Sequence, residues 1–282
     1  MRRFEYFEPQ TLGEACALLG RYAGRAQALA GGTDLLVELK EQLRRAECVV
    51  NIKKIPGIGA LAFDPERGLR IGALVTAREV ECSPVVLDRY PSLAQAVREL
   101  GSIQVRHRAT IVGNVCRASP SADTLPPLIA DGAAIVIHGS GGERRLALED
   151  FFTGPGKTVL KPDELVTGLE VPAPPPRCGK VYIKHGRRKA MELATVGVAV
   201  TLSPQDVRLV LGAVAPTPIR ALEAEALLRG RHPDAALIAR AARAAAEAAR
   251  PISNVRASAD YRREMVRVLT LRALERAGEL LR

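Results

Sequence analysis

Aromatic residues are scarce in this 282-residue sequence: it has no tryptophan, and aromatic residues make up only 4% of it. Proteins that hold single-stranded nucleic acid stack the bases on aromatic side chains, so this scarcity weighs against such a partner. The net charge of +10 would otherwise favour one, but the sequence has no nucleic-acid-reading motif. We therefore expect no nucleic acid, and assign the charge to solvated helix surfaces, an anionic cofactor or an acidic protein partner.

Paired metal ligands are also lacking. The five cysteines, Cys16, Cys48, Cys82, Cys116 and Cys178, are far apart and form no C-x-x-C motif. The histidines are equally dispersed and form no H-x-x-x-H pair. Iron–sulfur clusters and structural zinc sites usually need such local pairs. We therefore assign no metal ligand and no catalytic residue, and expect any redox centre to be a bound organic cofactor.

Long apolar runs are absent too. No stretch approaches the ~20 apolar residues that span a bilayer, and the N-terminal Met1-Arg-Arg-Phe segment lacks the apolar core of a signal peptide. We expect a cytoplasmic protein with no membrane partner. Its 47% hydrophobic and 26% charged residues are ordinary for a globular protein, and its length allows two domains.

A glycine turn is the most informative feature that is present. Ala26 to Ala30 predict a buried strand, Gly31 and Gly32 permit a tight turn, and leucines at helical spacing predict a helix from Leu35 to Gln42. Thr33 or Asp34 would cap this helix. Free N–H groups at such a turn bind anions, commonly phosphate. A glycine-rich turn without a ligand remains the alternative for this segment alone.

A second segment, residues 110–124, has a related pattern. Its β-branched start predicts a short strand, 111–116, that runs into Gly113-Asn114, where an N–H group would face a phosphate. The following loop contains Ser119, Ser121 and Asp123, which are suited to hydrogen bonds with a polyol. A helix from Leu125 to Ala130 follows. Alternatively, Ser121 or Asp123 only caps this helix.

The remaining patterns predict two regions of different character. Residues 11–23 predict a helix with Thr11 as its cap, and 48–52 a strand, so the first ~55 residues favour a small parallel sheet. From residue 58 onwards, strands and helices alternate, with a capping box at Thr76 and Glu79. The predicted elements are strands at 69–75, 134–138 and 165–171 and a helix at 91–100.

Pro172-Ala-Pro-Pro-Pro176 predicts a linker, because proline fits neither a helix interior nor a central strand. We expect one domain over 1–176, with subdomains 1–57 and 58–176, and a second over 177–282. The second should hold a three-stranded antiparallel meander followed by a helical bundle. Its expected strands are 181–184, 194–202 and 207–213, and its expected helices are 218–228, 234–250 and 258–281.

Together these motifs resemble the FAD-binding medium subunits of the molybdenum hydroxylases, the family of carbon monoxide dehydrogenase medium chain and xanthine dehydrogenase FAD-binding subunit. The resemblance rests on Ala30–Leu35, Thr110–Asn114 and Ala118–Asp123, with further similarity at 106–110, 151–154 and 182–190. It spans essentially the whole chain. One position departs from the pattern, since Val112 stands where the family usually has glycine.

The resemblance implies an α+β fold: a two-subdomain FAD-binding domain of the PCMH type, then a small C-terminal domain. It places the backbone of 30–35 and 110–114 on the pyrophosphate of FAD and the 119–123 loop on its ribityl or ribose. The implied cofactor-binding residues are Leu29, Ala30, Gly31, Gly32, Thr33, Asp34, Leu35, Leu100, Thr110, Gly113, Asn114, Ser119, Ser121, Asp123, Val166 and Lys184.

The resemblance also implies an activity. The chain would be an electron-transfer flavoprotein subunit that takes electrons from iron–sulfur clusters on a small partner and passes them through FAD to NAD or another acceptor. A molybdopterin-containing large subunit would oxidise the substrate. Two alternatives stay open: a stand-alone FAD-dependent oxidoreductase, in which His185, Arg187 or Glu192 would lie over the flavin, and a non-enzymatic nucleotide-binding assembly module.

Overall fold

The computed structural model describes residues 1–231 and 233–281, and it begins with a small parallel sheet in the order β1-β3-β2. The strands are β1 (Glu5–Phe7), β2 (Ala26–Leu29) and β3 (Cys48–Asn51), with helices α1 (Leu12–Tyr22) and α2 (Leu35–Lys40) between them. The Thr11 side chain caps α1 by accepting the N–H of Glu14. The predicted parallel sheet is confirmed. Strand β1 was missed because three largely exposed residues carry no hydrophobic alternation.

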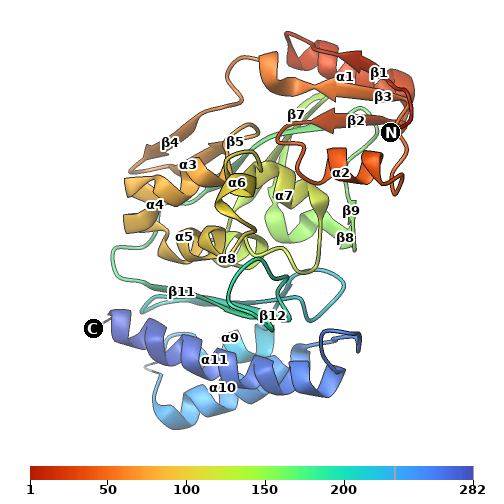
Figure 1. Ribbon diagram of the computed structural model, residues 1–282. Coiled ribbons are helices and arrows are strands. Elements are labelled where there is room, and N and C mark those ends of the chain that lie inside the picture. The colour runs from red at the N-terminus through yellow and green to blue at the C-terminus, as the bar shows by residue number, and fades with distance from the viewer. Residues whose placement is uncertain (232, 282) are drawn as a thin grey trace.

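The central layer is a five-stranded antiparallel sheet in the order β4-β5-β10-β6-β7, with a group of short helices on one side (Figure 1). The predicted capping box is present, since the side chains of Thr76 and Glu79 bond to each other's backbone N–H. The elements of this region are η1 (Ile52–Lys54), β4 (Leu61–Asp64), β5 (Gly68–Gly72), α3 (Ala77–Cys82), α4 (Pro84–Arg89), α5 (Pro91–Arg98), α6 (Ile103–Arg106), α7 (Ile111–Arg117), α8 (Leu125–Ala130), β6 (Ala134–Gly139), β7 (Gly142–Ala147), η2 (Leu148–Phe151), β8 (Phe152–Gly154), β9 (Lys157–Thr158) and β10 (Leu165–Val171).

The prediction of a strand at 111–116 is wrong, because this segment is helix α7. The Thr110 hydroxyl caps it by accepting the N–H of Gly113 at 3.0 Å. Ile111 and Val115, four residues apart, are both fully buried on one helix face. This packing outweighs the β preference of the branched residues. Val112 has a helical backbone here, so a side chain in place of the family's glycine causes no strain.

The C-terminal region contains an antiparallel sheet in the order β11-β12-β13-β14. Strands β11 (Gly179–His185), β12 (Val196–Leu202) and β13 (Val207–Gly212) confirm the predicted meander. Strand β14 (Ile219–Arg220) pairs with β13 and takes the start of the segment predicted as a helix. Helix α9 therefore spans only Leu222–Leu228, followed by α10 (Ala235–Ala248) and α11 (Ala259–Leu281). Among the described residues, no helix is long and apolar enough to cross a bilayer.

Helices cover both faces of the C-terminal sheet. Figure 1 shows β11 and β12 between α5 and α8 of the central layer and α10 and α11 at the opposite side. Side chains of β11 alternate between these faces. Val181 joins the apolar core formed with the C-terminal helices, whereas Tyr182 joins the core of the first domain. Strand β11 is thus the seam between the two cores.

Two buried ion pairs cross this seam. The ammonium of Lys180 lies 2.7 Å from Asp131 Oδ1, and the two side chains are 2% and 1% exposed. Lys184 lies 2.9 Å from Asp123 Oδ2, with side-chain exposures of 5% and 8%. The two aspartates follow and precede α8, so one short helix presents a carboxylate at each end to one strand. Lys180 also lies over the ring of Tyr90, 4.6 Å from its centroid.

Removing one partner of the Lys180–Asp131 pair should destabilise the protein. We expect Lys180→Met to lower the free energy of unfolding by about 3–5 kcal/mol, because the Asp131 charge would stay buried without its cation. Denaturant unfolding measures the change. The matched control is Arg25→Met, which breaks the pair with Glu47, whose side chains are 59% and 55% exposed; it should cost about 0–1 kcal/mol. Equal, small losses of unfolding free energy in both variants would contradict the stabilising role assigned to the buried Lys180–Asp131 pair.

Candidate functional site

The two segments singled out by the sequence lie against each other and line one cleft of about 470 Å³. The first contributes the turn between β2 and α2, and the second contributes the start of α7. The predicted residues that line the cleft are Ala30, Gly31, Gly32, Thr33, Asp34, Leu35, Leu100, Thr110, Gly113 and Asn114. The structure therefore brings together ten of the sixteen residues expected to bind the cofactor.

Close backbone packing explains the glycine at position 31. A Cβ built there would lie 2.1 Å from the carbonyl oxygen of Arg108 and 3.0 Å from the Cα of Ala109. The turn therefore packs directly on the backbone that leads into Thr110. Gly32 has a φ of +76°, a left-handed conformation that other residues adopt only with strain. Together the two glycines let the turn pack against the start of the second segment, so that both line the same cleft.

The turn that lines the cleft contains a run of backbone donors without partners among the described residues. In the described part of the chain, the N–H groups of residues 31–35 have no acceptor, and the first that is bonded is Leu36, to Gly32 O at 3.0 Å. Asp34 occupies the capping position of α2, but no capping bond from its side chain, or from Thr33, appears among the described residues. The prediction that the side chain of Thr33 or Asp34 caps this helix is therefore wrong. Open N–H groups that line a concave wall suit an anion.

Gly113 has a different role from the one predicted. Its N–H donates to Thr110 Oγ1 and so is already used within the cap of α7. Gly113 is exposed and gives the cleft a surface without a side chain. A Cβ there would lie only 2.7 Å from the Thr110 hydroxyl that caps α7. Asn114 accepts a hydrogen bond from the Thr124 hydroxyl at 2.6 Å, which ties α7 to the start of α8.

The other six predicted residues lie outside the cleft lining. Leu29 is buried beneath the turn, and Val166 is a core residue of β10, 2% exposed. Ser119 and Ser121 are half-buried and bond to each other within their loop. The interpretation of Ser121 or Asp123 as a helix cap is wrong: Thr124 holds that position, and in the described chain no side chain bonds there.

Asp123 lies instead at the domain seam. It is 6% exposed and accepts hydrogen bonds from the Tyr182 hydroxyl at 2.8 Å and from Lys184 at 2.9 Å. Burial raises the pKa of Asp123 to about 6, against the lowering effect of Lys184 and Tyr182. Because the folded pKa exceeds the ordinary value, ionisation of Asp123 opposes folding. The stability that comes from keeping Asp123 protonated in the folded protein is fully present below pH ~4 and is lost as the pH rises through about 6.

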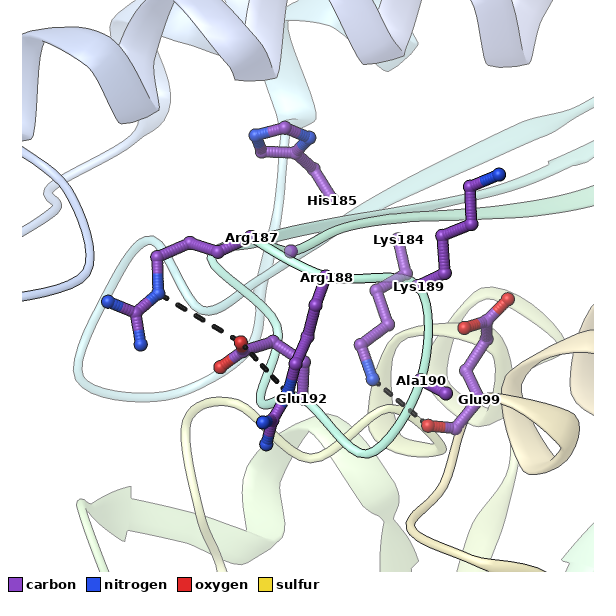
Figure 2. A pocket seen from close by; sticks show the side chains of 9 residues that line it. Glu99, Lys184, His185, Arg187, Arg188, Lys189, Ala190 and Glu192 are labelled. Carbon is purple, nitrogen blue, oxygen red and sulfur yellow. Dashed lines mark hydrogen bonds and ion pairs between the residues drawn. The ribbon is translucent and has the colours of Figure 1, made fainter.

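Lys184 lines a second cavity of about 440 Å³, which we call the rim pocket. Its ammonium donates to the carbonyl oxygen of Glu99 at 3.0 Å, and Figure 2 shows this contact at one side of the pocket. Glu99 lines the rim pocket, and the next residue, Leu100, lines the cleft. The other rim-pocket residues are His185 at the end of β11 and members of the loop 186–192 that follows, in which Arg187 and Arg188 point toward Glu192 (Figure 2).

Sequence reasoning missed an ion network in the cleft wall. Glu38 of α2 pairs with Arg44 at 2.6 Å and with Arg117 at the end of α7 at 2.7 Å. Arg117 follows Gly113 by four residues, so it shares a helix face with it. Recognising α7 as a helix would have placed this arginine at the site. Leu193, 54% exposed, was also missed and lines the cleft from the C-terminal domain.

Comparison with known proteins identifies the family. Residues 2–174 match the FAD binding domain in molybdopterin dehydrogenase, and residues 181–277 match the CO dehydrogenase flavoprotein C-terminal domain. The chain belongs to the FAD-binding medium subunits of the molybdenum hydroxylases. It is thus an FAD-binding subunit of a multi-subunit oxidoreductase complex.

Relatives match along their whole length. The carbon monoxide dehydrogenase medium chain of Hydrogenophaga pseudoflava is 33% identical over 280 residues, covering 98% of this chain and 97% of the relative. A putative xanthine dehydrogenase FAD-binding subunit of Escherichia coli K12 is 29% identical, with 96% and 95% covered. The structure of carbon monoxide dehydrogenase from Hydrogenophaga pseudoflava, which lacks the Mo-pyranopterin moiety, superposes with a TM-score of 0.95 at 34% identity, covering 100% of this chain and 99% of that one.

The close approach at Gly31 can be tested directly. We expect Gly31→Ala to weaken FAD binding about tenfold or more and to cost ~1–3 kcal/mol of stability, because its Cβ would push the turn off the 108–109 backbone. The matched control is Gly13→Ala in α1, where a Cβ meets nothing within 4 Å. Fluorescence titration with FAD and thermal unfolding give the two quantities. Unchanged affinity in a folded Gly31→Ala protein would show that the turn does not contact the cofactor.

Proposed function

We propose that this subunit is the electron exit of its complex. Bound FAD would accept electrons from iron–sulfur clusters on a small partner subunit and deliver them to NAD or another acceptor. A molybdopterin-containing large subunit would carry out substrate oxidation. The chain itself supplies binding, orientation and electrostatics, as proteins do for flavins generally.

One observation carries the proposal: the open N–H groups of residues 31–35 and the side-chain-free wall at Gly113 line the same cleft. The backbone donors suit the two phosphate groups of FAD, which a flavin with one phosphate would use only in part. Arg44 and Arg117 add positive charge at this wall, although Glu38 between them offsets part of it.

The remaining residues would act at the two ends of the cofactor. Leu100 and Leu193 face the cleft from opposite domains and would contact a flat ring system and exclude water from it. Lys184 would place a positive charge in the rim pocket, beside Glu99, whose neighbour Leu100 lines the cleft. The basic loop beyond it makes the rim pocket a favourable entrance for an anionic acceptor.

The identity of the cofactor tests the proposal. The protein, purified with whatever subunits accompany it, should release FAD on heating, and chromatography should show little or no FMN. Binding of two phosphate groups at residues 31–35 predicts this selectivity. Recovery of FMN alone would refute the assigned pyrophosphate site. Co-purification of a large molybdopterin-containing and a small iron–sulfur subunit would separate the proposal from a stand-alone flavoprotein.

A further inference from the structure

Tyr182 is a buried tyrosine beside the proposed flavin site. It lies on β11, is 3% exposed, and donates its hydroxyl proton to Asp123 Oδ1 at 2.8 Å. The other carboxylate oxygen of Asp123 accepts from Lys184 at 2.9 Å. Tyr182 and Lys184 are two residues apart on one strand, so both side chains point to the same face and hold one carboxylate between them.

This arrangement leaves Lys184 with a donor to spare. An ammonium group has three N–H donors, and within the described chain two are used, by Asp123 and by the carbonyl oxygen of Glu99. The side chain lines the rim pocket. A fixed cation with one remaining N–H in the rim pocket is suited to bind a polar edge of a ligand that extends there from the cleft.

The position of Lys184 depends on Asp123 being ionised. Three groups face that carboxylate: Lys184 and the Tyr182 hydroxyl lower its pKa, and the Glu99 side chain raises it, while burial raises it most. The balance puts its pKa at about 6, close to the pH at which proteins work. Loss of the tyrosine hydroxyl would shift this balance toward the neutral acid.

We propose that Tyr182 is a positioning residue of the flavin site: its hydroxyl holds the Asp123 carboxylate against Lys184 and so fixes the Lys184 ammonium at the rim pocket, against the carbonyl of Glu99 that precedes the cleft residue Leu100. This inference rests on the proposed function. It adds a residue that lines neither the cleft nor the rim pocket. Tyr182 acts through Asp123 and Lys184 and takes no direct part in redox chemistry.

The test is Tyr182→Phe, which removes only the hydroxyl and keeps the ring packing beside Gly197 of β12. Two quantities are followed between pH 5 and pH 9: the Asp123 carboxyl signal in protein labelled with carbon-13 aspartate, and the affinity for FAD. Loss of a hydrogen bond to the charged carboxylate should raise the pH midpoint of the Asp123 signal by about one unit. FAD affinity should fall at pH 6–7 and change little at pH 9. The midpoint of its pH dependence should move up by the same amount as the Asp123 midpoint.

Tyr90→Phe is the matched control. Tyr90 is also buried at the domain seam, but its hydroxyl donates to the carbonyl oxygen of Pro172 at 3.0 Å, away from Asp123. Tyr90→Phe should lower the melting temperature of the protein without moving the pH midpoint of the Asp123 signal or of FAD affinity. In an Asp123→Asn background, Tyr182→Phe should have no further effect on the pH profile, because the titrating group is gone.

The outcomes separate the two levels of inference. If wild-type protein, with its partner subunits, binds no FAD, the proposed function fails. If it binds FAD but Tyr182→Phe changes stability alone, with both midpoints in place, Tyr182 is only a structural residue. A shifted Asp123 midpoint with an unshifted FAD profile also overturns the positioning role.

Discussion

Strand β11 can occupy its place only because two lysine ammonium groups find carboxylates at the domain seam. Lys180 and Lys184 point toward the first domain, where Asp131 and Asp123 accept them at the two ends of α8. A slip of β11 by one residue would turn both lysines into the apolar core under the C-terminal helices. Buried ion pairs are weak evidence for stability but define geometry well. Here they fix the register of β11 and the position of its domain.

This constraint extends to the cleft through short contacts. The loop that contains Asp123 leads into Thr124, whose hydroxyl bonds to Asn114 in α7. Helix α7 carries the exposed glycine wall and ends at Arg117, which pairs with Glu38 of α2. The Gly31 turn lines the same cleft and is packed on the Arg108 backbone, which leads into Thr110 and α7. Domain docking, the cap of α7 and the glycine turn thus form one connected framework, so the seam supports the proposed flavin site.

Much of this architecture was predictable from local patterns. Capping at Thr11 and at Thr76 with Glu79, the strand before Gly31 and the C-terminal meander all depend on residues close in the sequence, and the structure confirms them. The segment 111–116 was mispredicted because β-branched residues favour strands locally, whereas burial of Ile111 and Val115 on one face favours a helix. Strand β14 was missed because two residues form a strand only when a neighbour such as β13 is already in place.

The sequence by itself determined the glycine turn, the paired motifs and, through their resemblance to a family, the cofactor. These features follow from backbone freedom and side-chain chemistry at single positions. Only the tertiary structure decided which groups face the cleft. It engages the Gly113 N–H within a helix cap, leaves the N–H groups of 31–35 open, and places Asp123 between Tyr182 and Lys184. The contacts of Asp123 with Tyr182 and Lys184 join residues 59 and 61 positions apart in the chain, and their geometry exists only once both domains have packed around α8.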